Sequence, residues 1–249
     1  MFKDIKGDWP KQDKLILCSC DEKYFKTYFK RFYTSFKDKW QLPIHVHIID
    51  PSKQSLKWLN DENISHTWCN TDSYNWSETI NKFKIKLPSY KNVDNKTIKQ
   101  WLYESYAQCQ RFVVLGNNMT ASQSVIVADV DAYAQHTPTR KEKKFLFANT
   151  AFSYYKQRIM ATFCHFHPKD LTIIKEVANS IVNTINKKYF KIGLDQKVLT
   201  ENFQEFEKLD DTWIRHYDVK CDSSKLAHSK CLIYHKKGSR GKLETNGSI

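Results

Sequence analysis

Glycine is scarce in this chain: six occur among 249 residues. No set of them forms a G-x-G-x-x-G or a G-x-x-x-x-G-K-[ST] motif, so the sequence lacks both the dinucleotide fingerprint of a Rossmann domain and a P-loop. A nucleotide bound by this protein must therefore be held by its phosphates in another way.

Paired cysteines and long apolar runs are also missing. The seven cysteines include no C-x-x-C pair, which excludes a zinc ribbon and a thioredoxin-type site. No stretch approaches the roughly 18 apolar residues of a membrane span, and the segment 1–6 has no apolar core of the kind that a signal peptide needs. We therefore expect a soluble cytoplasmic protein with reduced thiols, and leave peripheral membrane association open.

Acidic residues are outnumbered by basic ones. The chain has 40 Lys and Arg against 27 Asp and Glu, a net charge of +13, and 41% of its residues are hydrophobic. That apolar fraction is enough for a full core, and the length suits one domain spanning residues 1–249. The charge favours an anionic partner without choosing among nucleic acid, nucleotide, anionic glycan and membrane surface.

The hydrophobic pattern alternates between strands and helices. Short apolar runs predict strands at 14–20, 44–49, 124–128, 145–148, 158–166 and 232–234. Three- and four-residue apolar spacing predicts helices at 21–36, 96–112, 170–185 and 195–206. Between them we expect an ordered insertion at 52–95, a basic loop at 139–144 and a flexible basic end from about 236. The alternation indicates an α/β fold with a mostly parallel central sheet flanked by helices.

The most informative segment is an apolar strand that runs directly into Asp129-Val130-Asp131. In open α/β sheets ligands bind beyond the carboxyl ends of the strands. Two carboxylates there repel each other unless a cation lies between them, and Mn²⁺ or Mg²⁺ prefers such oxygen ligands. Asp129 and Asp131 are therefore predicted metal ligands, and the metal would neutralise a pyrophosphate. His45 and His47 share a strand face and could ligate a metal, but strand histidines near a sheet edge without a metal are the commoner case.

Four pieces, in order along the chain, resemble the GT-A-fold glycosyltransferases, most closely the glycogenin-like and lipopolysaccharide galactosyltransferase family. They are the strand 15–19 with its following helix, the helix ending at 110–112 before the D-x-D motif, Asp195-Gln196 opening a helix, and a late His235-x-x-Gly238 segment. The resemblance covers roughly residues 14–242. It implies a metal-dependent hexosyltransferase that uses a nucleotide-sugar donor, UDP-linked in our expectation, a glycan or lipid-linked glycan acceptor, and retention of anomeric configuration.

The resemblance also implies roles for individual residues. The nucleotide base would lie near Cys18 and Ser19, and His235 would complete the metal shell. Arg111 would pair with a phosphate or a carboxylate, because its planar fork matches either. Asp195 would accept hydrogen bonds from sugar hydroxyls, and Gln196 would line the reacting face. Lys236 would contact the phosphates, with Lys237, Arg240 and Lys242 as alternatives.

Two departures from the family pattern stand out. Met160-Ala161-Thr162 occupies the place of the usual Asn-Ala-Gly, and the segment after His235 is one residue longer than the usual form. Each assigned residue also has a structural alternative: a surface histidine for His235, a helix-surface arginine for Arg111 and a plain helix N-cap for Asp195.

Three other functions stay open at this point. A nucleotidyltransferase shares the strand and carboxylates but normally needs a glycine-rich N-terminal loop. A basic nucleic-acid-binding protein fits the net charge and the 14% aromatic content, although the lysines are dispersed. The third is a GT-A scaffold without catalytic activity. The candidate site residues argue against it, because all four are intact: Asp129, Asp131, Asp195 and His235.

Overall fold

A computed structural model describes residues 5–155, 157–188, 190, 193–210, 212–217 and 231–236. Its strands are β1 (Lys6–Gly7), β2 (Lys14–Asp21), β3 (Ile44–Ile49), β4 (Ser65–Cys69), β5 (Ser124–Ala128), β6 (Ala132–Ala134), β7 (Ala151–Tyr155), β8 (Arg158–Phe166), β9 (Glu207–Leu209), β10 (Ile214–Tyr217) and β11 (Ile233–Lys236). Its α-helices are α1 (Glu22–Tyr24), α2 (Lys30–Trp40), α3 (Lys53–Asp61), α4 (Trp76–Lys86), α5 (Asn95–Asn118), α6 (Arg140–Ala148), α7 (Leu171–Asn186) and α8 (Leu194–Asn202). A π-helical stretch, η1 (Phe25–Phe29), joins α1 to α2, and η2 (Pro88–Tyr90) and η3 (Pro168–Asp170) are 3-10 turns.

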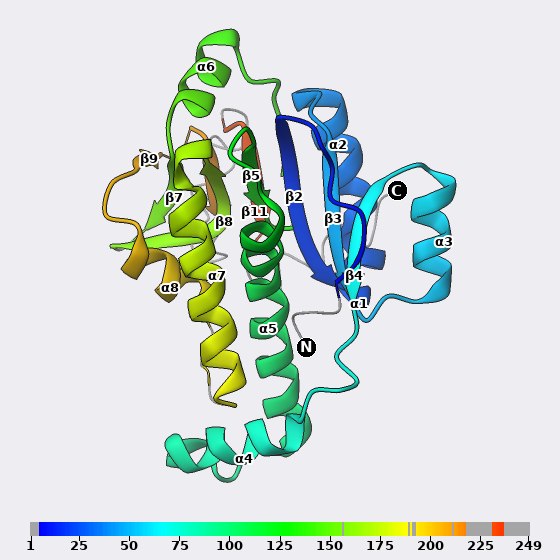
Figure 1. The fold of residues 1–249 in the computed structure, drawn as a ribbon, viewed down its shortest axis with the longest axis vertical. Helices are drawn as coiled ribbons and strands as arrows, with labels where there is room; N and C mark the ends of the chain where they lie inside the picture. Colours follow the sequence, from blue (N-terminus) through cyan, green and yellow to red (C-terminus); the bar gives the residue numbers. More distant parts are fainter. Residues whose placement is uncertain are drawn as a thin grey trace.

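A central sheet of eight strands has the order β1-β4-β3-β2-β5-β8-β7-β9 (Figure 1). Strands β4, β3, β2 and β5 run parallel, whereas β8 is antiparallel to both of its neighbours. A second sheet of three strands, β10-β11-β6, begins just after the D-x-D segment. The parallel half therefore brings the carboxyl ends of β2 and β5 to one edge, where ligands of open α/β sheets bind.

Each face of the sheet is covered by its own apolar layer. Leu17 and Val127 face α5 and α7, which cross the front of the sheet in Figure 1. Ile16 and Ile126 face the opposite layer, where the helix predicted at 21–36 buries the phenylalanines 25, 29, 32 and 36. Alternation along a strand sends successive side chains to opposite faces, so two such layers require strands that are apolar throughout.

The predicted α/β class is confirmed, as are most individual elements. Strands form at the predicted 14–20, 44–49, 124–128, 158–166 and 232–234, and Asp21 caps α1 by accepting a hydrogen bond from the Tyr24 backbone N–H. The predicted insertion at 52–95 is ordered and holds α3, β4 and α4, of which β4 joins the central sheet. Strand β7 was not predicted.

The prediction at 139–148 is wrong: the basic loop and the strand at 145–148 are together one helix, α6. Thr139 accepts a hydrogen bond from the Glu142 backbone N–H, and the Glu142 side chain accepts one from the Thr139 backbone, which forms a capping box. The capping box and the lysines on the exposed face both favour a helix, so residues 145–148 continue α6 and do not form a separate apolar strand.

Within the described part of the chain, no helix combines the length and the apolar character that crossing a membrane requires.

Candidate active site

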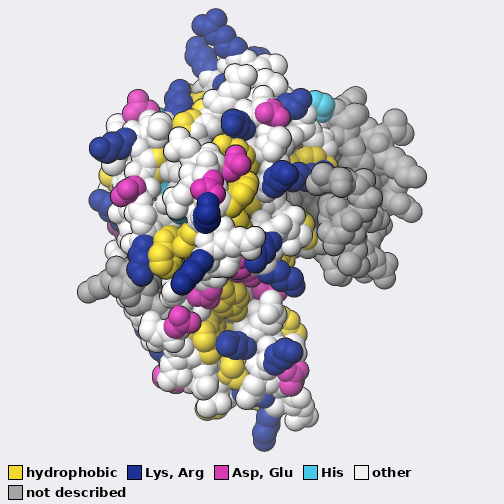
Figure 2. All heavy atoms as spheres, turned by 90° about the vertical axis from the view of Figure 1, so that its right-hand side faces the viewer, with side chains coloured by type: hydrophobic (Ala, Val, Ile, Leu, Met, Phe, Trp, Pro, Cys, Tyr) yellow, Lys and Arg dark blue, Asp and Glu magenta, His cyan; other side chains and the backbone are white. Residues whose placement is uncertain are grey.

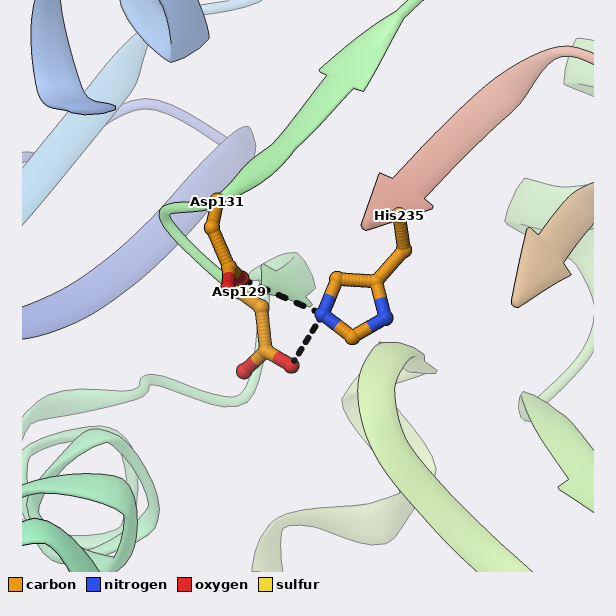
Figure 3. Close-up of side chains that lie close together, drawn as sticks. All are labelled: Asp129, Asp131 and His235. Carbon is orange, nitrogen blue, oxygen red and sulfur yellow. Dashed lines mark hydrogen bonds and ion pairs between the residues drawn. The ribbon is translucent and has the colours of Figure 1, made fainter. Parts of the chain in front are cut away.

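The D-x-D segment turns sharply at the carboxyl end of β5. The Asp129 backbone N–H donates to the Thr162 carbonyl of β8 at 2.9 Å, and the Ala132 N–H returns to the Asp129 carbonyl at 3.0 Å. The chain then enters β6, which pairs with β11 so that His235 lies opposite Ala132. Backbone pairing therefore brings a histidine more than a hundred residues away to the two aspartates (Figure 3).

Asp129, Asp131 and His235 form a cluster whose ligand atoms all lie within 4.8 Å of one another. The His235 Nε2 atom is 3.1 Å from Asp131 Oδ1 and 3.3 Å from Asp129 Oδ2 (Figure 3). Two bonds of about 2.1 Å at a right angle separate neighbouring ligands by about 3 Å, so these spacings fit one six-coordinate ion. The set of two carboxylates and one imidazole suits Mn²⁺.

His235 is buried, with 3% of its surface exposed, so the alternative of a surface histidine is wrong. The same holds for Arg111, which is also 3% exposed and does not lie on a helix surface.

Arg111 is a buried cation that contacts the candidate metal cluster through Asp129. It lies on α5, forms an ion pair with Asp129, and donates from one guanidinium nitrogen to Asp195 Oδ2 at 3.0 Å. Burial opposes the charge of Arg111, but the two carboxylates outweigh it, so the pKa of the guanidinium is raised. The sequence predicted either a phosphate or a carboxylate as the partner of Arg111, and in this structure Arg111 pairs with the carboxylates of Asp129 and Asp195.

Asp195 belongs to the first turn of α8 and is 1% exposed. The residue that caps this helix is Gly193, in the left-handed conformation with φ of 79°, so the alternative of Asp195 as a plain N-cap is wrong. One oxygen of Asp195 accepts from Arg111, whereas Oδ1 is buried without a hydrogen-bond partner among the described residues. A buried acceptor of this kind indicates a position that a ligand donor would satisfy.

These residues line a cleft of about 180 Å³. Ser19, Arg111, Asp129, Asp131, Asp195, Gln196 and His235, seven of the predicted site residues, all contribute to its lining. The structure does not bring Cys18 to the cleft: its side chain is fully buried in the core on the α2 side of β2, and burial raises the pKa of its thiol. Ser19, the next residue, points into the cleft because side chains alternate along a strand.

Several cleft residues were not predicted from the sequence: Cys20, Asp21, Tyr24, Glu104, Ala107, Gln108, Val130 and Thr162. A signal existed for one group, because Glu104, Ala107, Gln108 and Arg111 recur at three- and four-residue spacing and so share one face of α5. Burial, with Glu104 nearby, raises the pKa of the Asp21 carboxyl.

The predicted phosphate contacts cannot be placed in this cleft. Lys236 ends β11, but its side chain lies outside the described part of the structure, as do Lys237, Arg240 and Lys242. The predicted flexible end after 236 likewise falls outside the described residues.

His45 and His47 belong to β3, and among the described residues neither is part of a candidate metal-binding group. His45 contacts the hydroxyls of Ser65 at 2.8 Å and Thr67 at 3.0 Å, and His47 contacts Thr67 at 3.0 Å. Burial lowers the pKa of each imidazole to about 3, so both are neutral near pH 7. They are buried residues that the neighbouring strand β4 satisfies, and β3 lies between β4 and β2 inside the sheet, not near its edge as the sequence favoured.

Several solved structures that align with this chain are glycosyltransferases. The galactosyltransferase LgtC, in complex with donor and acceptor sugar analogues, aligns over 95% of this chain and 96% of its own with a TM-score of 0.53 and 12% identity. The glycosyltransferase GlyE of Streptococcus pneumoniae TIGR4 aligns with a TM-score of 0.58 and 13% identity, over 96% of this chain and 61% of its own. The bifunctional glycosyltransferase WbbM aligns with a TM-score of 0.56 and 11% identity, over 98% of this chain and 51% of its own.

These likenesses confirm the predicted GT-A-type fold. At 10–13% identity they establish the fold alone. No family model matches the sequence, and no curated protein matches it either.

Proposed function

We propose that this chain is a metal-dependent glycosyltransferase that moves a hexose from a UDP-sugar to a glycan or lipid-linked glycan acceptor, as one domain and with retention of anomeric configuration. The observation that carries the proposal is the convergence of Asp129, Asp131 and His235 with the buried Arg111–Asp195 pair in one cleft. The GT-A-type fold supports it, since this cleft lies at the strand ends where such a fold binds its donor.

Asp129, Asp131 and His235 would hold the cation, Mn²⁺ or Mg²⁺. When bound, the cation acts as a Lewis acid that neutralises charge on the leaving diphosphate. The protein's own part is to keep two repelling carboxylates within reach of one ion. Arg111 pairs with Asp129, and His235 lies within 3.3 Å of both aspartates.

Asp195 and Gln196 would face the sugar. The Asp195 Oδ1 atom is a buried acceptor that a sugar hydroxyl can satisfy, and Arg111 fixes the carboxylate by holding its other oxygen. Gln196 follows directly on α8 and lines the same cleft, where its amide can donate to and accept from the donor. Ser19 presents a buried hydroxyl without a described partner at the end where we place the nucleotide base.

The charge of the cleft argues against the nucleic-acid alternative. Its described lining includes the carboxylates of Asp21, Glu104, Asp129, Asp131 and Asp195 but a single guanidinium, that of Arg111. Such a surface repels phosphate unless a cation is bound, so the net positive charge of the chain lies elsewhere.

The test is release of nucleoside diphosphate from a panel of UDP-, GDP-, CDP- and dTDP-sugars, with Mn²⁺ and with EDTA. We expect release from a UDP-sugar that requires the metal, and its loss in Asp131→Asn but not in Asp72→Asn, a substitution of an exposed aspartate. Product anomers read by NMR would test retention. Metal-independent release, or none from any sugar nucleotide, would contradict the proposal.

A further inference from the structure

A second surface lies at the end of the molecule formed by α4, η2 and the start of α5. This surface, which we call the α4 surface, comprises residues 82–99. It contains six lysines, at 82, 84, 86, 91, 96 and 99, against one acidic residue, Asp94. Figure 2 shows basic side chains, with some acidic ones among them, around a hydrophobic patch on this lower part of the molecule.

Two large hydrophobic side chains of the α4 surface are exposed to solvent. The side chain of Ile85 is 74% exposed, the largest exposed fraction among the large hydrophobic residues described, and Tyr90 is 37% exposed. Their neighbour Phe83 is buried, so α4 is already anchored to the core through its other face. Ile85 is therefore available to a partner without any loss of packing.

The lysines are also available. Lys82 pairs with Glu78 at 2.7 Å, but no described residue forms an ion pair with the lysines 84, 86, 91, 96 or 99. The 24-residue helix α5 begins here, so the positive end of its dipole adds to the field. Aliphatic lysine stems beside an exposed isoleucine suit a boundary between water and hydrocarbon, where the ammonium groups stay with anionic headgroups.

The α4 surface also lies close to the cleft. Glu104 of α5 lines the cleft, and α5 begins nine residues earlier, at Asn95. A rise of 1.5 Å per residue places the start of α5 about 14 Å from Glu104. A surface bound through α4 would therefore lie within reach of the cleft.

We propose that the α4 surface docks the protein peripherally on an anionic lipid bilayer, with Ile85 inserted at the interface and the surrounding lysines on the headgroups. The proposal goes beyond sugar transfer and stands independently of it. Charge complementarity selects this occupant, since each lysine near an anionic membrane adds to the attraction. A second copy of this chain would bring the same lysines against one another.

Helix α6 provides a matched control. It also carries a basic cluster, at 140, 141, 143 and 144, and an exposed Phe145 at 37%. However, the Phe145 ring packs at a tilt against Trp213, with ring centroids 5.8 Å apart, and Lys143 donates to the Trp40 carbonyl, so both are partly engaged. Figure 1 places α6 at the opposite end of the molecule from α4.

The experiment is co-sedimentation with vesicles of phosphatidylcholine alone or mixed with phosphatidylglycerol. We expect binding only to the mixed vesicles, weakened by salt, and reduced about tenfold both by Ile85→Ser and by Lys84→Glu with Lys86→Glu. Phe145→Ser and Lys141→Glu with Lys144→Glu should change it less than twofold. Thermal unfolding of each variant checks the fold, and release of UDP from a soluble donor should stay unchanged.

Three results would overturn the proposal. Equal losses in the α4 and α6 variants would mean that net charge alone drives binding. Unchanged vesicle binding in Ile85→Ser would show that Ile85 does not insert into the membrane interface. A dimer in light scattering that Ile85→Ser dissociates, without vesicle binding, would assign the α4 surface to a second copy. If the unaltered protein bound the vesicles but released no UDP from a sugar donor, the result would contradict the proposed sugar transfer and leave the membrane proposal intact.

Discussion

Arg111 donates to Asp195 across 3.0 Å while it also pairs with Asp129, and the arginine and Asp195 are both buried. One guanidinium thus ties the segment that carries the metal ligands to the first turn of α8. Because the three groups come from α5, the end of β5 and α8, this contact fixes the relative position of the candidate cation site and the candidate sugar site.

Arg111→Met should destabilise the fold by about 3–5 kcal/mol, because it leaves Asp195 and Asp129 without their counter-ion in a buried place. Urea unfolding measures this change. Combining Arg111→Met with Asp195→Asn should recover part of the loss, since the remaining buried charge is removed as well. Lys197→Met, on the exposed side of α8, is the matched control and should change stability by less than about 0.5 kcal/mol. An Arg111→Met loss no larger than this would contradict the assigned role.

Asp131→Asn should leave the metal-free fold nearly as stable as the unaltered protein while abolishing stabilisation by Mn²⁺ with UDP. The amide keeps an oxygen for the contact with His235 and relieves repulsion from Asp129. A ligand at 100 times its Kd stabilises the folded state by about 2.7 kcal/mol, which a thermal scan detects readily. A full Mn²⁺-dependent shift in Asp131→Asn would show that the cluster does not bind the ion.

The sequence predicted those parts of the fold whose signals are local. The apolar run before Asp129 and the aromatic spacing of α2 identified their elements because burial repeats along the strand or helix. Helix α6 was missed because its capping box, Thr139 with Glu142, was outweighed by the apolar residues at 145–148. Strand β4 was missed because one histidine and two hydroxyl residues give it a polar pattern, although His45 and His47 of β3 contact the two hydroxyls across the strand pair.

The same distinction applies to the site. Asp129 and Asp131 are neighbours in sequence, so a motif could identify them, and the resemblance to a family supplied His235 and Asp195. The pairing of Arg111 with Asp195 needs the packing of α5 against α8, which no local pattern encodes. Cys18 is buried because the even-numbered residues of β2 face the layer that contains α2, whereas Leu15 and Leu17 face α5. Which layer covers which face of the strand cannot be read from the local sequence.

Acid should weaken the fold through the buried histidines of β3. Burial lowers the pKa of His45 and His47 to about 3, below the value near 6.5 of an unfolded chain. Between these values the unfolded state binds more protons, so stability is full above pH 6.5 and falls as the pH drops toward 3. Each histidine should contribute a loss of about 1–2 kcal/mol between pH 6.5 and pH 5.

Urea unfolding at a series of pH values measures this loss. His47→Gln should flatten the dependence between pH 6.5 and pH 5, whereas His136→Gln, at an exposed position, should not alter it. An unchanged slope in His47→Gln would mean that other groups govern the acid transition.

Gly116→Ala should destabilise the packing of α5 on α7, although alanine favours a helix by about 1 kcal/mol. A Cβ at this position would lie 2.5 Å from the Ala178 Cβ and 2.8 Å from the Ile174 carbonyl oxygen. The helices must then separate, and we expect a net loss of about 1–3 kcal/mol in urea unfolding. Adding Ala178→Gly should recover part of it by removing the nearer contact, and a net gain in Gly116→Ala would show that the two helices do not approach this closely.

Asp195→Asn is the sharpest test of the sugar site, because the substitution keeps the shape of the side chain and removes its charge. The Oδ1 atom of Asp195 is a buried acceptor without a described partner, and an amide nitrogen in that position offers a donor to a sugar hydroxyl that also donates. We expect kcat/KM for the UDP-sugar to fall about 100-fold, equivalent to about 2.7 kcal/mol, while the affinity for UDP with Mn²⁺ stays within about twofold. Glu201→Gln, on the exposed face of the same helix, should leave both unchanged. If Asp195→Asn weakened UDP binding and turnover in parallel, Asp195 would act by holding Arg111 and the metal ligands in place, and the sugar contact would be wrong.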